Sequence, residues 1–405
     1  MIGTSVYETL GVPKVINASG TKTRIGGSRI RTEALAAMQE AATDFVRLSD
    51  LQAAASERIS ALTEAEAGYV TNGASGALTL ATAACIAGTD PGTMYRLPDT
   101  SGVADEVVMP RTHRTGYDHA IRAAGADIVD IGTNDEYLGT GARNVEAWEY
   151  VEAIGTDTIA VAHVYKSDGA PPLGEVCETA HEHDLPVVVD AAAEVPPVDN
   201  FSWFTDRGAD VVAFSGGKGI RGPQTTGILA GRADLIESVA FQQLDLHAAA
   251  EVWEPPVDLV DADGINGVPR QGIGRALKVG KEELVGLLAA LDAFVDEDHE
   301  ATRRAWQRRS EQVASRLAAA EGLSATVDGG ARSVAPVVVA DVDPTVVGRT
   351  ATDIVRDLRR ENPRVFVGAD YLDAGEFSIN PMCLTDEEAD YTVQRVLARV
   401  EGSDD

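Results

Sequence analysis

Seven short apolar runs constrain the fold of this chain more than any other feature of its sequence. The runs are rich in β-branched residues, and segments in which apolar residues recur at helical spacing separate them. They span 67–71, 105–109, 126–131, 157–165, 186–192, 209–215 and 225–231. Because strands that alternate with helices pair mostly in parallel, the pattern predicts an α/β fold. We expect a mostly parallel seven-stranded sheet with helices on both faces.

The pattern changes after residue 275, where a long amphipathic helix is expected. Beyond it we expect strands near 324–328, 334–341, 365–368 and 376–379, and helices at 347–360 and 385–400. This mixture predicts a small α+β domain over 276–405, after a large domain over 50–275. Residues 1–49, with a helix expected over 32–48, form an N-terminal segment that packs with the small domain.

The charge of the chain excludes several classes of partner. Lys and Arg total 34 and Asp and Glu total 64, so the net charge is −30. This balance argues against nucleic acid as a partner, because phosphate binding needs a basic surface. No apolar run is long enough for a membrane span, and the N-terminal residues do not resemble a secretory signal. Three scattered cysteines suit a reducing compartment, so we expect a cytoplasmic protein without a membrane partner.

Lysine is depleted selectively, since only six of the 34 basic residues are lysines. High net charge destabilises a compact state by self-repulsion, and salt relieves that repulsion. We therefore expect a halophilic protein adapted to a high-salt cytoplasm. The alternative is an acidic enzyme of an ordinary cytoplasm.

One of those lysines, Lys218, stands in a glycine-rich turn between two apolar runs, ADVVAFSGGKGIRGPQTTGILAG. A lysine there has no packing role, and the neighbouring glycines let a ligand approach the backbone. Gly217, Gly219 and Gly222 also match a G-x-G-x-x-G pattern. That pattern marks a dinucleotide site only where it opens a helix, whereas here Pro223 and a strand follow. The turn alone leaves a solvent-facing lysine as an equal alternative.

Asp190 ends the apolar run PVVVD, and open α/β sheets bind ligands at the carboxyl ends of their strands. A helix cap or turn aspartate is the structural alternative. The spacing favours the ligand, because Asp190 and Lys218 follow neighbouring predicted strands and are 28 residues apart.

A third segment, TNGASG, follows the first run and opens a helix. The backbone N–H groups of Gly73, Ala74, Ser75 and Gly76, together with the helix dipole, suit a phosphate. Many strand-to-helix turns are small and polar, so this segment is weak evidence by itself. A phosphate cradle, a strand-end aspartate and a later lysine together predict a pyridoxal-phosphate site. In such a site the lysine forms a Schiff base and the aspartate pairs with the pyridine nitrogen.

The chain resembles the selenocysteine-synthase-like (L-seryl-tRNA selenium transferase-like) family of fold-type I pyridoxal-phosphate proteins. That family is related to class V aminotransferases and cysteine desulfurases and includes D-glucosaminate-6-phosphate ammonia-lyase. The resemblance extends over residues 15–290 and none of its motifs is specific for a substrate. The matching segments are VINASGTKTRIGGS, YVTNGASGALTLATAACIAG, VVVDAAAEVPP, FSGGKGIRGPQTTGILAGR and GIGRALKVGKEELVGLLAAL.

The resemblance assigns roles to particular residues of the large, cofactor-binding domain. Lys218 is the Schiff-base lysine and Asp190 the partner of the pyridine nitrogen, while Ser215 and residues 73–76 hold the phosphate. His113 stacks on the ring, and Ser167 lies near the ring hydroxyl. For His113 the alternative is a solvated loop histidine. Cysteine desulfurases carry a glutamine three residues after the aspartate, but this chain has Ala193.

Arginines grip substrate carboxylates, because the planar guanidinium matches a carboxylate. Arg275 is our first candidate and Arg24 a second, each with a surface arginine as the alternative. No metal site is expected, because Cys177 and His181 could share a helix face but have no further ligand.

The resemblance implies β-elimination from a hydroxylated amino acid or a 2-amino-2-deoxy sugar acid, which yields a 2-keto acid and ammonia. An aminotransferase or racemase would use the same residues. Selenium transfer to seryl-tRNA fits poorly with the net charge of −30. A silent binding protein would have no need of both Asp190 and Lys218. Fold-type I sites generally lie between subunits, so the resemblance also implies a homodimer or larger homo-oligomer.

Overall fold

The computed structural model describes residues 6–132, 145–166, 169, 171–265, 267–270, 272–329 and 334–402. The chain forms two compact units, which are taken one at a time below. The larger unit is Ile30–Asp296, and the smaller combines Met1–Arg29 with Glu297–Asp405. No helix among the described residues is long and apolar enough to cross a membrane.

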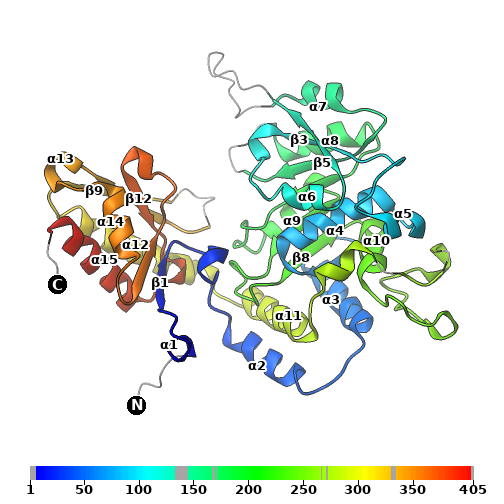
Figure 1. Cartoon of the computed structure of the whole chain (residues 1–405), viewed down its shortest axis with the longest axis horizontal. Helices are drawn as coiled ribbons and strands as arrows, with labels where there is room; N and C mark the ends of the chain where they lie inside the picture. The colour runs from blue at the N-terminus through cyan, green and yellow to red at the C-terminus, as the bar shows by residue number, and fades with distance from the viewer. Residues whose placement is uncertain are drawn as a thin grey trace. The chain divides into compact units, whose positions relative to one another are not determined.

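A mixed sheet of seven strands forms the centre of the larger unit, in the order β2-β8-β7-β6-β5-β3-β4 (Figure 1). Only β8 runs antiparallel to its neighbours β2 and β7, and the other pairs are parallel. The strands are β2 Ala67–Thr71, β3 Glu106–Pro110, β4 Asp127–Ile131, β5 Thr158–Val164, β6 Val187–Asp190, β7 Val211–Ser215 and β8 Gly227–Gly231. The α/β fold and the predicted seven-stranded sheet are confirmed.

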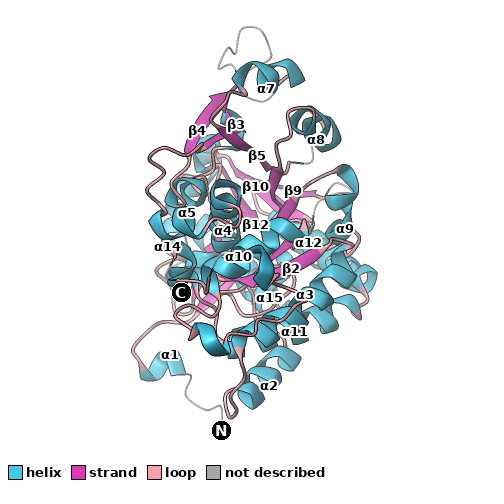
Figure 2. Ribbon diagram, turned by 90° about the vertical axis from the view of Figure 1, so that its right-hand side faces the viewer, coloured by secondary structure: helices cyan, strands magenta, loops and turns pink. Residues whose placement is uncertain are grey.

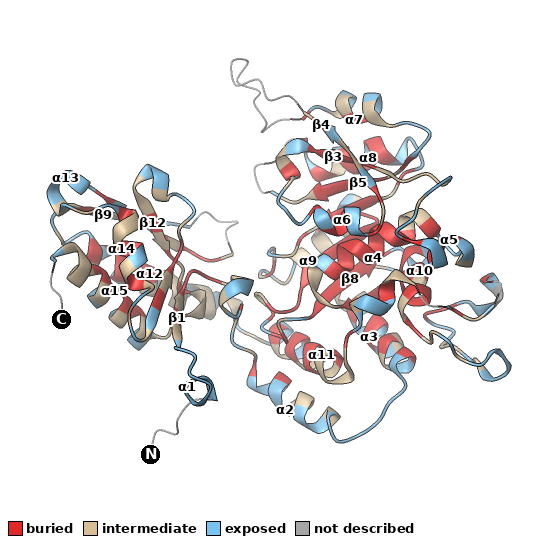
Figure 3. Cartoon of the chain, in the orientation of Figure 1, coloured by how far each residue is buried: buried red, intermediate tan, exposed pale blue. Residues whose placement is uncertain are grey.

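Helices cover both faces of this sheet (Figure 2). Successive strand residues point to opposite sides, so each face carries apolar side chains that the helices bury. Val161, Val189 and Val212 enter one buried cluster, while Ala162, Val188 and Val211 enter the other. The first cluster contains residues of α3 (Leu48–Thr63), α8 (Leu173–His181) and α11 (Lys281–Val295). The second contains residues of α4 (Gly73–Ala87), α6 (His119–Ala123) and α10 (Ala233–Gln243). Strands buried on both faces explain why the runs are continuously apolar rather than alternating (Figure 3).

The boundaries between the units fall at 29/30 and 296/297, and not at 49/50 and 275/276 as the sequence predicted. The reason is that α2 (Thr32–Ala41) and α11 pack on each other. Gly286 of α11 faces Met38 so closely that a Cβ atom there would lie 2.6 Å from Met38 Cγ. Leu284 and Leu287 are buried with residues of the large sheet. Both helices therefore belong to the larger unit.

The helix expected over 32–48 is also shorter than predicted, because α2 ends at Ala41 and α3 begins at Leu48. The Thr43 backbone N–H and the Thr43 hydroxyl both donate to the Glu40 carbonyl oxygen, which ends the regular helical bonding. Phe45 and Val46 lie beyond the end of α2 and are exposed.

The smaller unit contains an antiparallel sheet and a separate pair of strands. The sheet has the order β12-β10-β9, from β9 Leu323–Asp328, β10 Val337–Val342 and β12 Glu376–Ile379. In the pair, β1 (Val15–Ala18) runs parallel to β11 (Arg364–Val367). Three helices, α12 (His299–Leu317), α14 (Ala351–Leu358) and α15 (Asp386–Val400), bury residues with these strands. The helix predicted over 347–360 is thus shorter and begins with a capping box of Thr350 and Asp353.

Candidate active site

The carboxyl-end edge of the large sheet brings together most of the residues singled out from the sequence. Four of the strands, β3, β5, β6 and β7, are parallel, so their last residues all lie at this edge. These residues are Pro110, Val164, Asp190 and Ser215. In the antiparallel part, Gly227 of β8 pairs with both Ser215 and Thr71. The end of β2, which leads into α4, is therefore at the same edge. This is where open α/β sheets bind ligands.

The first turn of α4 fits the predicted phosphate cradle. The helix begins at Gly73, and its N-cap residue Asn72 makes no capping hydrogen bond through its side chain. The first backbone N–H groups of an α-helix have no partner within the helix. Gly227 lets this turn approach the sheet, because a Cβ atom there would lie 2.7 Å from the Ala74 nitrogen. Buried Ser215 pairs with Gly227, so its strand ends beside the helix start.

The Lys218 turn is held by bonds between its own two ends. The Gly216 N–H donates to the Thr226 carbonyl at 2.9 Å, and the Gly222 N–H donates to the Gly216 carbonyl at 2.8 Å. Within it, the Arg221 N–H donates to the Lys218 carbonyl at 3.1 Å. These bonds give the turn a defined backbone, and Lys218 within it is half-buried.

Arg31 fastens this turn to the rest of the larger unit, a contact that the sequence analysis missed. Its Nε donates to the Ile220 carbonyl at 2.8 Å, and its backbone N–H donates to the Arg221 carbonyl at 2.9 Å. The guanidinium also lies 5.7 Å from the centre of the Phe294 ring. Arg31 is buried and is 187 positions before Lys218 in the chain, so no local pattern pointed to it.

Asp190 ends β6, and its neighbour in the register of β7 is Ala213. Its Oδ1 accepts the Ala192 N–H at 3.1 Å. Burial raises the pKa of the carboxyl, although the Ala192 N–H and the positive charge of Lys218 act in the opposite direction. The side chain borders a narrow cavity whose wall also includes His163, Met109 and Tyr117. Asp190 is thus a half-buried carboxyl group whose strand neighbours β7, and the charge of Lys218 acts on it, as the spacing predicted for neighbouring strands.

His113 lies at the same edge, in the turn η2 (Arg111–His113) that follows β3. The Val164 N–H donates to its Nδ1 at 3.2 Å, and Val164 pairs with Asp190 in the sheet. His113 is therefore buried and not the solvated loop histidine of the alternative. Burial, with contributions from His163 and Lys166, lowers its pKa to about 3. A neutral imidazole suits stacking on a flat ring.

His163 on β5 is a second buried imidazole that the sequence analysis did not select. Its ring meets that of His113 edge to face, with the centroids 4.6 Å apart. Burial and then the charge of Lys166 lower the pKa of His163 to about 4. Within the described part of the chain its Nδ1 has no hydrogen-bond partner. The sequence gives no signal for this residue, because it lies inside a continuous apolar run where core side chains are expected.

The remaining predicted ligands are Ser167, Arg275 and Arg24. Ser167 lies outside the described residues. Arg275 is exposed on η7 (Ile273–Leu277), which packs on α10 and α4. Arg24 is exposed on η1 (Thr23–Ile25) in the smaller unit. All three roles stay predictions.

The chemistry of this edge fits pyridoxal phosphate. Half-buried Asp190 can pair with a cationic ring nitrogen, and Lys218 supplies an amine for a carbonyl group. The start of α4 offers to an anion backbone N–H groups that have no partner within the helix. The orphaned Nδ1 of buried His163 and the cavity beside Asp190 leave polar groups for a ligand to satisfy.

Comparison with known proteins gives a consistent result. The family model described as aminotransferase class-V matches residues 117–354. The D-glucosaminate-6-phosphate ammonia lyase of Salmonella typhimurium is 30% identical over 402 residues, which cover 97% of each chain. The 5'-C-glycyluridine monooxygenase-decarboxylase of a Streptomyces species is 29% identical over 405 residues, which cover 97% of this chain and 91% of that one.

A solved structure of a D-glucosaminate-6-phosphate ammonia-lyase matches the whole chain over its own whole length, with a TM-score of 0.80 and 29% identity. The resemblance and the fold predicted from the sequence are confirmed by these matches. The substrate is not, since the two full-length relatives have different activities in their names and nearly equal identity.

Proposed function

From the premise that the chain belongs to the aminotransferase class-V family, whose members depend on pyridoxal phosphate, we propose that it is a pyridoxal-phosphate-dependent ammonia-lyase. The proposed reaction is β-elimination from a hydroxylated amino acid or a 2-amino-2-deoxy sugar acid. The products are a 2-keto acid and ammonia. The observation that supports the cofactor is that Asp190 ends β6 beside β7, and that the charge of Lys218, in the turn after β7, acts on its carboxyl group. The relative that is 30% identical over 97% of each chain supports the lyase reaction.

The predicted site residues that lie at the sheet edge each have a task in this proposal. When bound, the cofactor supplies an electron-withdrawing ring that stabilises negative charge at the substrate carbon next to the amine. Asp190 keeps a proton on the ring nitrogen, and His113 covers one face of the ring. Ser215 and the N–H groups of residues 73–76 bind the phosphate. The Lys218 amine anchors the cofactor and then takes the proton from the substrate carbon.

Product analysis tests this reaction. The full-length chain with pyridoxal phosphate is incubated with serine, threonine and 2-amino-2-deoxy sugar acids, with and without a phosphate ester. We expect equal amounts of ammonia and 2-keto acid without any added amino acceptor. Amino-group transfer to an added keto acid, or loss of optical activity without ammonia, would replace the lyase by an aminotransferase or a racemase.

The monooxygenase-decarboxylase relative favours one further candidate, an oxidative decarboxylation of an amino acid side chain on a larger molecule. An oxygen electrode and a carbon dioxide trap in the same screen separate the two reactions. The lyase consumes no oxygen and releases no carbon dioxide. Uptake of oxygen that matches carbon dioxide release would favour the second candidate.

A further inference from the structure

Glu194 is a half-buried carboxyl group near Lys218 that has no task in the proposed chemistry. It follows Asp190 by four residues, in the loop that leaves β6. Two hydrogen bonds to the Glu194 backbone hold this residue in place. The Glu194 N–H donates to the Ala191 carbonyl at 3.1 Å, and Asn200 Nδ2 donates to the Glu194 carbonyl at 2.5 Å.

The Lys218 turn packs directly on this loop. A Cβ atom on Gly219 would lie 2.0 Å from the carbonyl oxygen of Val195 and 2.9 Å from Pro196 Cδ. Only a glycine permits this approach, since real Cβ atoms essentially never come within 3.0 Å of another heavy atom. The residue after the lysine therefore touches the residue after the glutamate. This contact places the two side chains in one neighbourhood.

Charge effects agree with this placement. Burial raises the pKa of the Glu194 carboxyl, the charge of Lys218 lowers it, and the charge of Asp190 raises it. Among the described residues, Lys218 and Asp190 are the charged groups that act on Glu194. The Lys218 amine thus lies in the field of two carboxyl groups, from β6 and from the loop behind it.

In the proposed site Asp190 would face the ring nitrogen, and Glu194 is a second carboxyl group whose charge interacts with that of Lys218. We propose that Glu194 is a positioning residue that stabilises the protonated Lys218 amine and so sets the pH at which this amine becomes a free base. The inference rests on the role of Lys218 in the proposed function. A nearby carboxylate favours the charged form of an amine, and only the neutral amine can attack a carbonyl or take a proton.

Competitive acetylation tests the inference on the full-length chain after removal of the cofactor. Trace acetic anhydride labels neutral amines, and peptide mass spectrometry gives the labelling of Lys218 relative to exposed Lys278 between pH 6 and 10. In Glu194→Gln we expect this ratio to rise about threefold to tenfold at pH 7 to 8, with its midpoint at lower pH. Glu194→Asp keeps the charge and should restore most of the wild-type profile.

Glu237→Gln is the matched control. Burial also raises the pKa of Glu237, which lies on α10 and accepts the Asp261 N–H at 2.6 Å. This variant should leave the ratio unchanged. On the loaded chain, the pH midpoint of cofactor absorbance should shift in Glu194→Gln and remain in Glu237→Gln.

An unchanged Lys218 profile in a folded Glu194→Gln variant would overturn the inference. A rise that Glu194→Asp shares in full would also overturn it, because the effect would then follow the shape of the side chain and not its charge. These outcomes are separate from the proposed function. That function fails if the cofactor does not attach to Lys218, whereas the acetylation comparison needs no cofactor.

Discussion

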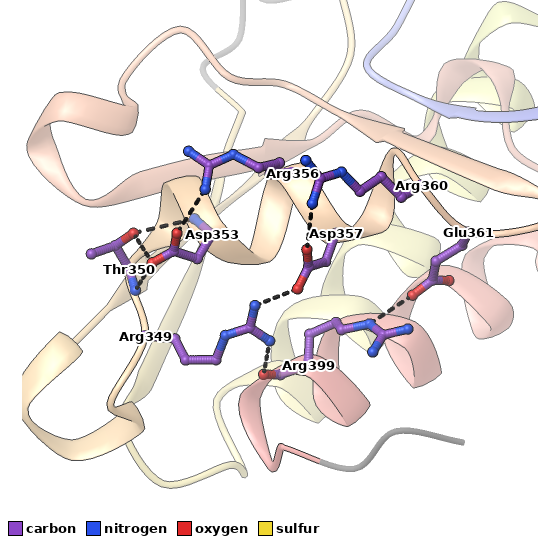
Figure 4. Close-up of polar contacts among 8 residues, drawn as sticks. All are labelled: Arg349, Thr350, Asp353, Arg356, Asp357, Arg360, Glu361 and Arg399. Atoms are coloured by element: carbon purple, nitrogen blue, oxygen red, sulfur yellow. Dashed lines mark hydrogen bonds and ion pairs between the residues drawn. The ribbon is translucent and has the colours of Figure 1, made fainter.

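The pKa values of carboxyl groups shift in opposite directions at the sheet edge of the larger unit and in an arginine network of the smaller one. We define this network as Arg349, Thr350, Asp353, Arg356, Asp357, Arg360, Glu361 and Arg399. At the edge, burial raises the pKa of Asp190 and Glu194. In the network, Asp357 bonds to Arg349 and Asp353 to Thr350, and these bonds lower the pKa of both carboxyls (Figure 4). The two regions differ in the largest influence on the pKa of each acid, which is burial at the sheet edge and a side-chain hydrogen bond in the network.

This difference separates stability from function. A carboxylate whose pKa is lowered by its partners stabilises the fold at neutral pH, and one whose pKa is raised by burial destabilises it. Perturbed groups of the second kind gather at sites that bind and react. Arginine serves the network well, since its fork can bond to a carboxylate and to a carbonyl together, as Arg349 does with Asp357 and Arg399.

The largest effect is expected for Asp190→Asn. Turnover should fall about 10²- to 10³-fold, because the ring nitrogen loses its charged partner. The melting temperature should stay the same or rise, since the substitution removes a carboxyl group whose charged form is disfavoured by partial burial. Steady-state kinetics and thermal melts of the same preparation measure both. A clear drop in melting temperature would show that Asp190 stabilises the fold and would remove the contrast.

The next largest effect is expected for Gly219→Ala, which should reduce stability and cofactor binding by displacing the backbone. The new Cβ atom would lie 2.0 Å from the Val195 carbonyl oxygen, so the turn or the loop must move. We expect a loss of about 3 kcal/mol in the free energy of unfolding and weaker cofactor binding. Gly174→Ala on α8 is the control, since nothing lies within 4 Å of its added Cβ. Equal denaturation midpoints for the two variants would contradict the packing described here.

Glu361→Gln should act on stability alone. Glu361 is only 5% exposed, and it accepts hydrogen bonds from Arg395 Nε at 2.7 Å and from Arg399 Nε at 3.0 Å. Loss of its charge should reduce the free energy of unfolding by about 2 kcal/mol. Turnover per folded molecule should stay unchanged. Glu300→Gln, in an ion pair on α12 that leaves Glu300 86% exposed, should cost less than about 0.5 kcal/mol.

The smallest effect is a difference in acid sensitivity between the regions. Asp353 and Asp357 have lowered pKa values, so their contribution is present above the ordinary value of 3.8 and lost as the pH falls through their folded pKa. Asp190 and Glu194 have raised pKa values, so they cost nothing while protonated at low pH, and their penalty grows as the pH rises from the ordinary values of 3.8 and 4.5 to their folded pKa. Hydrogen exchange between pH 5 and pH 3, corrected for intrinsic rates, should show protection falling first in 349–361. Earlier loss in 187–195 would reverse the comparison.

The sequence predicted the large sheet well because most of its strands are buried on both faces and are therefore continuous apolar runs, the edge strand β4 being the exception. It predicted the ends of α2 and of the units poorly. The spacing of apolar residues over 32–48 does not show that Thr43 bonds back to Glu40. It also does not show that α11 packs on α2, a contact between segments some 240 residues apart.

The same limit holds for the candidate site. Asp190, Ser215 and residues 73–76 stand at strand or helix ends, where local sequence patterns are informative. Arg31 and His163 have no such signal, since one acts across the chain and the other lies within a strand. Glu194 follows Asp190 closely in the sequence, but only the close approach of Gly219 to Val195 connects it with Lys218.

The central claim is that the sheet edge holds pyridoxal phosphate on Lys218, and borohydride reduction of the loaded full-length chain tests it most directly. Reduction makes the bond between the cofactor and its lysine permanent, and peptide mass spectrometry then identifies the residue. The account predicts one phosphopyridoxyl group per chain, on the peptide that contains Lys218, and none in Lys218→Ala. A label on another of the six lysines, or a loaded chain with Lys218 unmodified, would contradict it.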